Sequence, residues 1–274
     1  MVKESMMKQT EIGLIPEDWE VLKIKDIVEN GKIPSGIYKD IKLYGKGNSI
    51  IKLGDVFRYD FFKPELAQKV QLTEKEIRSY KIQIGDIIVA LASVKLEGVG
   101  KVMLVNNLFE ETAYDHNVAL IRLTSEYSNT FICNLFKSNV VRKSISAKAT
   151  QVGTTFLKSS TLLNLTIPVP PLAEQEAIAT ALSDCDSWID SIEEVLAKKR
   201  LIKQGAMQEL LTPPSTGSGT AADGELVEPW EVKKLGTISE IVMGQSPLSA
   251  YYNQNGIGLP LVQGNAVIKS ENNN

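Results

Sequence analysis

Histidine and cysteine are scarce in this chain, and their scarcity excludes several kinds of site. The 274 residues contain one histidine, His116, and two cysteines, Cys133 and Cys185. A metal site with two imidazole ligands is therefore excluded, and without a CxxC or Cys/His cluster we predict no metal site. We expect His116 to be a hydrogen-bonded structural residue. We expect both cysteines to be buried and to act as small hydrophobic residues.

Long apolar runs are also missing. No run approaches the roughly 18 residues that cross a bilayer, so we predict no membrane segment. The opening MVKESMMKQTEIG lacks the apolar core of a signal peptide, and we expect a cytoplasmic protein. With 43% hydrophobic and 23% charged residues, the composition is that of a globular protein of one to two domains.

Motifs for catalysis are absent as well. The chain has no Asn/Asp-Pro-Pro-Tyr/Phe motif of the kind that amino-directed methyltransferases use, because its Pro-Pro pairs stand in VPPL and TPPS. No GxxxxGK[ST] phosphate loop is present, and GKGNS at Gly45–Ser49 is too short to be one. Asp60, Glu65 and Lys69 have the residue types of a metal-dependent nuclease, but an exposed loop and helix is the favoured interpretation. We predict no catalytic residue and no cofactor.

Acidic residues are missing from one long segment. The net charge is −3, but residues 1–165 hold 23 Lys+Arg against 19 Asp+Glu, which makes this part basic by +4. No carboxylate occurs in the 47 residues from Tyr127 to Ala173, which contain Lys137, Arg142, Lys143, Lys148 and Lys158. This distribution favours a negatively charged partner.

The pattern of apolar residues predicts an α+β domain over residues 1–168. Turn residues separate short strand-like runs at Ser49–Leu53, Asp86–Ala92, Gly100–Val105 and Val118–Leu123. Helical periodicity covers Thr73–Tyr80 and Asn129–Ser146. We expect one mixed domain that pairs these strands and helices. Trp19 is expected to be a core anchor.

A long helix is predicted at residues 169–212, beginning at Leu172 after Pro170-Pro171 and ending before Pro213-Pro214. Apolar residues alternate in spacings of four and three, which is a heptad pattern. We call these residues the seam: Ile178, Leu182, Cys185, Ile189, Ile192 and Leu196. Some 40 residues give a rod of about 60 Å. We expect a partner helix to cover the seam, because the rod is too long to pack wholly against its own domain.

An internal repeat follows a Ser/Gly/Pro-rich linker at residues 213–223. The opening GLIPEDWEVLKIKDIVE recurs as GELVEPWEVKKLGTISE, with eight identities in register 211 residues apart, among them Trp19 and Trp230. A second unit is therefore expected to begin at residue 224 and to be cut short by residue 274. We expect a natural or engineered truncation, or a part of a larger chain.

Segment 167–212 resembles the central helix of type I restriction–modification specificity subunits, including its PPL-x-EQ entry and KQG-xMQ-xLL exit. The opening IP-x-x-W-x-V-x-K-x-x-D and the element GDIIVA fit the same family. The resemblance implies a non-catalytic subunit whose target-recognition domain reads one half of a split DNA sequence. It also implies that helices pack antiparallel as a spacer between half-sites, and that methyltransferase and restriction subunits bind to them.

Two polar segments have the residue types that DNA contact requires. The first supplies Tyr38, Lys39, Lys42, Tyr44, Lys46 and Asn48. The second supplies Arg142, Lys143, Lys148, Gln151, Thr154 and Thr155, and Lys95 lies in a separate turn. We expect double-stranded DNA to bind these segments.

Three functions stay open: a DNA-recognition subunit, a Mg²⁺-dependent nuclease that acts alone, and a coiled-coil scaffold without DNA affinity. The first is favoured. Since this chain has one spacer helix, we expect a homodimer in which two copies of the seam cover each other.

Overall fold

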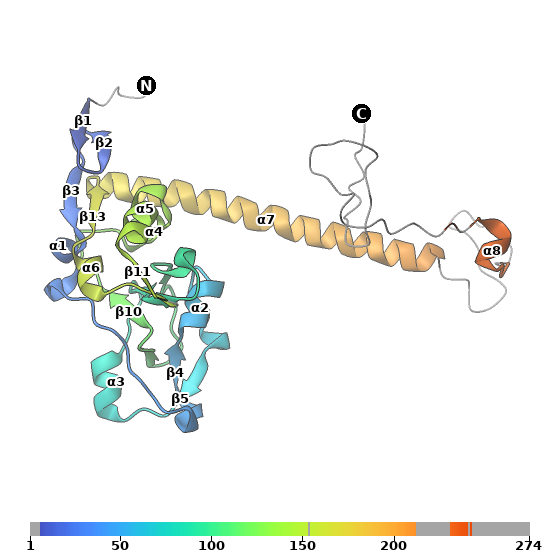
Figure 1. Ribbon diagram of the computed structural model, residues 1–274, viewed down its shortest axis with the longest axis horizontal. Coiled ribbons are helices and arrows are strands. Elements are labelled where there is room, and N and C mark those ends of the chain that lie inside the picture. Colours follow the sequence, from blue (N-terminus) through green and yellow to red (C-terminus); the bar gives the residue numbers. More distant parts are fainter. Residues whose placement is uncertain (1–5, 153, 212–230, 241, 243–274) are drawn as a thin grey trace, which may run out of the picture. The chain divides into compact units, whose positions relative to one another are not determined.

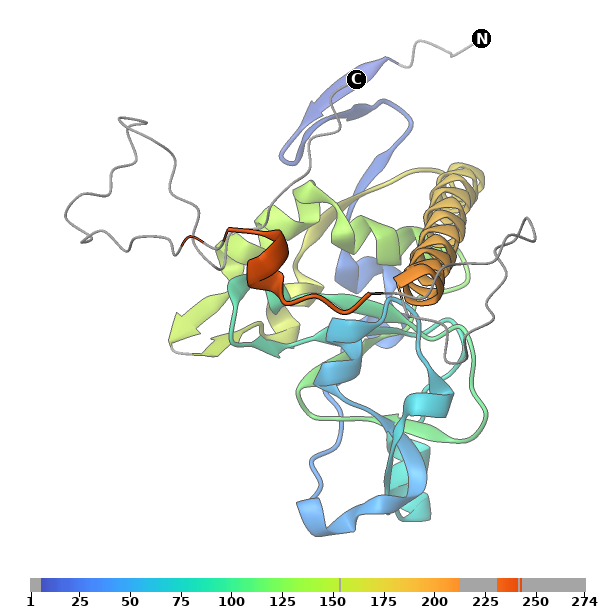
Figure 2. The same ribbon diagram turned by 90° about the vertical axis from the view of Figure 1, so that its right-hand side faces the viewer.

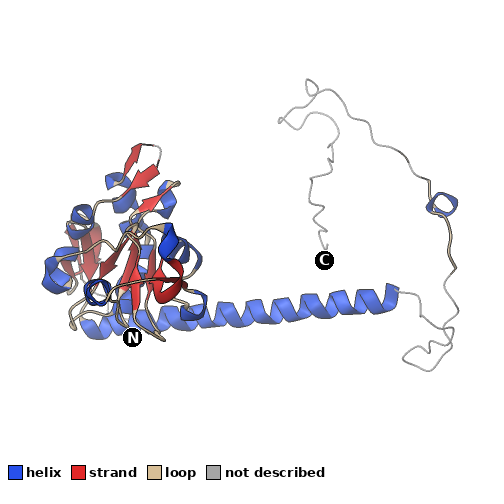
Figure 3. Ribbon diagram, turned by 90° about the horizontal axis from the view of Figure 1, so that it is seen from below, coloured by secondary structure: helices blue, strands red, loops and turns tan. Residues whose placement is uncertain are grey.

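The computed structural model describes residues 6–152, 154–211, 231–240 and 242 (Figure 1). The chain divides into two units, Met1–Lys198 and Lys199–Asn274. The first contains all the described β-strands and the beginning of the long helix. Figure 3 shows most of these strands inside the domain, with short helices around them.

A three-stranded antiparallel sheet forms the centre of the domain, in the order β10 (Val118–Ile121), β6 (Ile87–Ala90), β8 (Val102–Leu104). Side chains of a strand alternate between its two faces. Ile87 and Val89 accordingly belong to one apolar cluster, whereas Ile88 and Ala90 belong to another. Both faces of the sheet are therefore buried, which explains why its strands are apolar at every position.

Two helices lie over the first face of the sheet: α4 (Asn129–Lys137) and α5 (Asn139–Lys148). The single helix predicted over Asn129–Ser146 is wrong, because Ser138 interrupts it. Ser138 has extended backbone angles, φ −66° and ψ 151°, and its hydroxyl accepts a hydrogen bond from the Val141 amide as an N-cap. A capping serine thus starts a second helix in a segment whose apolar periodicity indicated a single continuous helix.

The second face carries a mixed sheet in which β4 (Tyr44–Ile51) pairs antiparallel with β5 (Gln68–Val70) and parallel with β9 (Thr112–Tyr114). Its register shifts between Tyr44 and Asn48. Gly47 has φ +102°, and a side chain there would lie 2.5 Å from the Val70 carbonyl oxygen. Only glycine fits this irregular strand, so the Gly-Lys-Gly sequence serves the fold. Helices α2 (Leu53–Arg58) and α3 (Glu74–Tyr80) follow β4 and β5.

Shorter elements complete the domain. The hairpin of β1 (Met7–Thr10) and β2 (Gly13–Pro16) lies at one end of it in both Figure 1 and Figure 2. A small sheet joins β7 (Ala92–Ser93), β12 (Thr154–Phe156) and β11 (Thr150–Val152). Further short helices are α1 (Ile24–Ile27) and α6 (Ser159–Leu163), with single 3₁₀ turns at Glu29–Gly31, Ile41–Leu43, Pro64–Leu66 and Leu96–Gly98.

The beginning and end of the domain meet in an antiparallel pair of strands, β3 (Glu20–Lys23) and β13 (Thr166–Val169). Helix α7 (Leu172–Leu211) begins three residues after β13, at the predicted position. Among the described residues, no helix could cross a membrane. The predicted α+β fold with a long helix is confirmed.

Local structure also agrees with the predicted repeat. Helix α8 (Leu235–Ile238) begins 211 residues after α1, which is the spacing of the sequence repeat. Lysine occupies the N-cap in both copies, Lys23 and Lys234. Trp230 and most of residues 224–274 lie outside the described residues, as does the linker 213–223. The boundaries of the linker and of the second copy of the sequence repeat, predicted to begin at residue 224, stay a prediction.

Candidate nucleic-acid interface

The first predicted DNA segment leaves three of its side chains free for a partner. It passes through the 3₁₀ turn Ile41–Leu43 into β4, and Lys42 and Lys46 are exposed. The side chain of Tyr38 is 73% exposed. Its ring meets His116 edge to face, with 5.0 Å between ring centroids. These groups supply two cations and an aromatic surface.

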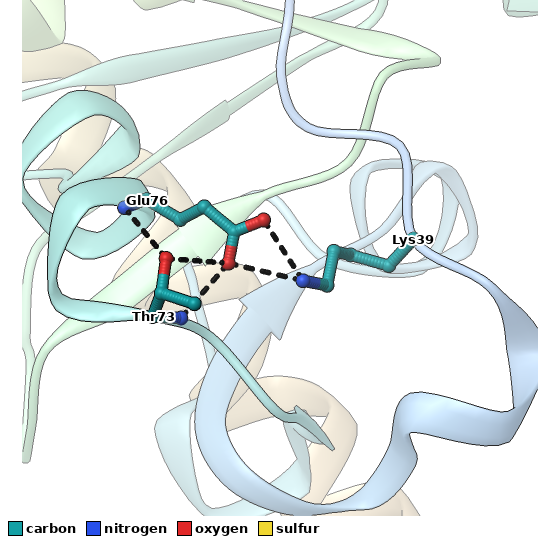
Figure 4. A network of polar contacts seen from close by, with 3 residues as sticks. All are labelled: Lys39, Thr73 and Glu76. Atoms are coloured by element: carbon teal, nitrogen blue, oxygen red, sulfur yellow. Dashed lines mark hydrogen bonds and ion pairs between the residues drawn. The ribbon is translucent and has the colours of Figure 1, made fainter.

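Lys39, from the same segment, has a different role. Its ammonium lies 2.9 and 3.0 Å from the two carboxylate oxygens of Glu76, and its side chain is only 10% exposed (Figure 4). The Glu76 carboxylate also accepts a hydrogen bond from the backbone amide of Thr73, which is the N-cap residue of α3. The Thr73 amide and then the Lys39 ammonium lower the pKa of Glu76. The expected DNA contact at Lys39 is therefore corrected: this lysine cross-links the segment to α3.

A cavity of about 370 Å³ lies beside Tyr38 and is also lined by Tyr44, Lys52 and His116. The Lys52 ammonium lies 4.6 Å from the centre of the Tyr44 ring, and burial raises the pKa of the Tyr44 hydroxyl. Asn48 is half-buried and donates to the Glu111 carbonyl at 3.5 Å. Lys52 and His116 were not predicted as part of this site.

His116 is hydrogen-bonded, as predicted. Its Nε2 lies 3.1 Å from Asn117 Nδ2, and its Nδ1 lies 3.3 Å from the buried carboxylate of Asp115. Asp115 also accepts bonds from the backbone and side-chain amides of Asn117. This network fixes the imidazole beside Tyr38 at the rim of the cavity. In the sequence, His116 precedes an apparent strand, and nothing in that pattern indicates that its ring faces Tyr38.

The second predicted segment is divided by burial. Lys143 and Lys148 on α5 and Thr154 on β12 are exposed. Gln151 pairs through its backbone with Thr155, and its side chain lies outside what the structure describes. Thr155 is 0% exposed, so its expected contact with DNA is corrected. β12 is the middle strand of its sheet, and the side chain of Thr155 lies on the covered face.

Arg142 is likewise committed to the protein. Its guanidinium donates to the carbonyl oxygens of Val99 at 2.8 Å and Glu97 at 2.7 Å. Burial lowers its pKa. Arg142 therefore joins α5 to the 3₁₀ turn at Leu96–Gly98, and its expected contact with DNA stays a prediction.

A cleft of about 600 Å³ lies between α2, β8, α4 and α5, and sequence reasoning did not find it. Basic residues outnumber acidic ones along its walls, with Arg58, Lys63, Lys101, Lys137 and Arg142 against Asp60 and Glu97. Lys137 pairs with Asp60 at 2.9 Å. Arg58, Lys63 and Lys101 are exposed and have no ion pair among the described residues. The adjoining pocket shares Phe57, Glu97 and Lys101 with this cleft and adds the predicted Lys95.

Asp60, Glu65 and Lys69, the residues of the possible nuclease site, do not come together among the described residues. Asp60 contacts Lys137, whereas Lys69 contacts Glu110 and Ser49. Glu65 lies in a separate 3₁₀ turn. In the described part of the chain, no three His, Cys, Asp or Glu side chains are grouped so that they could hold a metal ion.

The seam on α7 is mostly exposed within its own unit. Ile178 packs against the core of the domain, whereas Leu182, Ile189 and Leu196 are about half exposed and Ile192 is 62% exposed. Cys185 is also exposed, so the expectation that both cysteines are buried is wrong for this residue. Cys133 is buried, and burial raises the pKa of its thiol to about 11. Trp188 is exposed beside the seam.

Residues 16–203 match the family described as the type I restriction modification DNA specificity domain. The chain is 30% identical over 281 residues to the MjaIX type I restriction enzyme specificity subunit of Methanocaldococcus jannaschii, covering 97% of this chain and 62% of that protein. It is 28% identical over 193 residues to the EcoKI specificity subunit of Escherichia coli K12, covering 68% and 40%.

The fold is shared with a solved structure. The HsdS subunit from Thermoanaerobacter tengcongensis superposes with a TM-score of 0.50 at 20% identity, covering 90% of this chain and 61% of that chain. The chain spans less than two thirds of the length of these relatives. Since the family match extends over more than half of the sequence, this chain belongs to the type I restriction modification DNA specificity domain family.

Proposed function

We propose that this chain is a non-catalytic DNA-recognition subunit that reads one half of a split DNA target. The observation that carries the proposal is a basic cleft in a domain of the DNA specificity family. Phosphate contacts supply much of the affinity of DNA-binding proteins, and they need exposed Lys and Arg. Arg58, Lys63 and Lys101 meet that requirement although the whole chain is acidic.

Two groups of residues divide the work of recognition in this proposal. The cleft, with Lys143 and Lys148 on α5, contacts the phosphate backbone and sets the position of the domain. Tyr38, Lys42, Lys46 and Thr154 reach the edges of bases, because side chains that donate or accept hydrogen bonds in a groove provide sequence preference. Gln151 is assigned to the second group because its amide side chain can donate and accept hydrogen bonds at base edges.

The spacer helix α7 holds two recognition domains at a fixed separation in this proposal. The exposed seam supports an antiparallel homodimer of the chain, which would read an interrupted palindrome. Charge supports the antiparallel direction. Residues 172–194 contain seven carboxylates and no Lys or Arg, whereas Lys198, Lys199, Arg200 and Lys203 follow. Antiparallel helices bring unlike halves together, and parallel helices bring like halves together.

Methyltransferase and restriction subunits are the proposed protein partners, bound to α7 and the domain. The alternatives have less support. A nuclease lacks a grouped metal site among the described residues, and a scaffold without DNA affinity leaves the basic cleft without a purpose. The relatives that are matched are named as specificity subunits of type I restriction enzymes.

Exchange of the recognition domain tests the proposal. Residues 12–165 are replaced by the corresponding domain of another family member, and the chain is expressed with its methyltransferase partner. Sequencing of methylated DNA should show that the half-sites read by this chain change and that their separation stays the same. An unchanged methylated sequence would mean that recognition does not lie in this domain.

A further inference from the structure

The side-chain amide of Gln175 joins three elements at the base of the spacer helix. It lies in the first turn of α7 and is 1% exposed. Its Nε2 donates to the Pro170 carbonyl at 2.9 Å, just after β13, and its Oε1 accepts from the Ser128 amide at 2.9 Å. Ser128 is the N-cap of α4. One buried side chain therefore ties the start of the spacer helix to the link that follows β13 and to a helix of the recognition domain.

The same turn is held by its backbone and by packing. The amides of Glu174 and Gln175 both donate to the Pro171 carbonyl, at 2.9 and 3.0 Å. One turn later Ala179 is buried and Ile178 packs against the core. Among the seam residues, those after Ile178 are exposed. The contacts that can fix the direction of α7 within this unit are thus concentrated in its first two turns.

We propose that Gln175 is a positioning residue that sets the angle between the spacer helix and the recognition domain, and thereby the DNA spacing that the protein accepts. This inference rests on the proposed function. An amide suits the task because it satisfies a donor and an acceptor at once, and both bonds have a direction. Apolar contacts alone stabilise without fixing an angle as closely.

A small change in the angle of α7 at Gln175 produces a large displacement at the far end of the helix. From Leu172 to Lys198 the helix rises about 40 Å at about 1.5 Å per residue. A tilt of about 10° at its base then moves the far end by about 7 Å. This displacement runs across the helix axis and is comparable to two base-pair steps of about 3.4 Å, so it changes where a domain held by the far end meets the DNA.

Two variants remove the hydrogen bond between Ser128 and Gln175, one from each partner. Gln175→Ala removes the amide. Ser128→Pro removes the backbone N–H that Gln175 accepts from, and its φ of −78° is one that proline adopts. Because Ser128→Pro also loses the hydroxyl that caps α4, Ser128→Ala is its matched control. Gln204→Ala, at an exposed glutamine of the same helix, is the control for Gln175→Ala.

The experiment measures spacing and sequence preference separately. Each variant is expressed as the full chain with its methyltransferase partner in cells. They carry plasmids on which the wild-type half-sites are separated by spacers up to two base pairs shorter or longer. For Gln175→Ala and Ser128→Pro, we expect the preference for the wild-type spacer over one a base pair longer to fall by about tenfold, or about 1.4 kcal/mol. The half-site sequences should not change, and both controls should behave as wild type.

Three results would overturn the inference. Folded variants could keep the sharp spacing preference of the wild type, or could lose half-site selectivity to the same extent as spacing. Both variants could also fail to fold by circular dichroism, which would assign the contact to the stability of the domain. A wild-type chain that directs no sequence-selective methylation is a different result, because it overturns the proposed function and this inference with it.

Discussion

Arg122 and Asp86 form a two-bond ion pair at the end of the central sheet. Arg122 Nε lies 2.7 Å from Asp86 Oδ1, and Nη2 lies 2.6 Å from Oδ2. Asp86 is 1% exposed and also accepts from the Gln83 amide. Its carboxylate raises the pKa of Arg122. Asp86 precedes β6 and Arg122 follows β10, so the pair fixes the register of two adjacent strands.

We predict that Arg122→Ala lowers the free energy of unfolding by about 3 kcal/mol, because a buried carboxylate loses its counter-ion. Denaturant unfolding followed by circular dichroism measures the change. Lys143→Ala, at an exposed position, should stay within about 0.5 kcal/mol of wild type. Equal stability of the two variants would show that the pair contributes little.

Lys63→Ala combined with Lys101→Ala should weaken DNA binding and lower its salt dependence. Two lost phosphate contacts reduce the slope of log K against log salt by about 1.8. Fluorescence anisotropy at several salt concentrations measures both quantities. Lys25→Ala with Lys32→Ala, two exposed lysines outside the cleft, provide the matched control. An unchanged slope would remove the cleft from the interface.

Lys143→Ala combined with Lys148→Ala should have the same kind of effect, weakening binding to all sequences alike. Gln151→Ala, in contrast, should change which bases are preferred, because a base contact carries sequence information and a phosphate contact does not. Binding to a randomised DNA library distinguishes the two results. A double variant that binds as wild type at every salt concentration would exclude α5 from the interface.

Thr155→Val should stabilise the protein by about 1 kcal/mol and leave DNA preference unchanged. The Thr155 hydroxyl is buried and has no hydrogen-bond partner among the described atoms, so its removal relieves a desolvation cost at nearly constant volume. Thermal denaturation measures the stability, and binding to a randomised DNA library measures the base preference. A shift in base preference would instead show that β12 opens to place Thr155 on DNA.

Ile189→Lys with Ile192→Lys should convert a dimer into a monomer. Burial of each large apolar side chain in the seam is worth about 1.5–3 kcal/mol, and two lysines would forgo it. Analytical ultracentrifugation at micromolar concentration measures the mass. Ser187→Lys with Ser191→Lys adds the same charge at exposed positions on the side of the helix away from the seam and is the control. A monomeric wild-type chain would mean that something else covers the seam.

The two cysteines should report the same dimer by chemical labelling. Burial raises the pKa of Cys133 to about 11, so little reactive thiolate is present at pH 8 and its alkylation should be slow. Cys185 should react quickly in dilute protein and more slowly as the concentration rises, because dimerisation covers the seam. Peptide mass spectrometry after iodoacetamide treatment follows each thiol. Labelling of Cys185 that does not depend on concentration would contradict the dimer.

Much of the fold could be predicted because it depends on local patterns. Helix α7 begins at Leu172 as expected, since two prolines and then a heptad pattern define its start. Helix α3, Glu74–Tyr80, lies within the run Thr73–Tyr80 that was predicted to be helical. The central strands lie where apolar runs indicated, although their ends shifted by one or two residues. Ser138 escaped prediction because a cap inside a periodic apolar segment is a weak signal.

The candidate site could be predicted only in part. Basic segments and an acid-free stretch are visible in the sequence, and they led to Lys42, Lys143 and Lys148, which are exposed. The sequence could not identify the cleft, because Arg58, Lys63 and Lys101 come from separate elements. Nor could it distinguish a free lysine from a paired one.

Sequence alone thus determined the family, the α+β class, the long helix and the basic character of the first 165 residues, because each depends on residues close in the chain or on composition. Tertiary structure decided which charges are available. Lys39 pairs with Glu76, 37 residues away, and Arg142 donates to carbonyls more than 40 residues away. Burial and pairing depend on such distant contacts, and the pattern of neighbouring residues along the chain does not encode them.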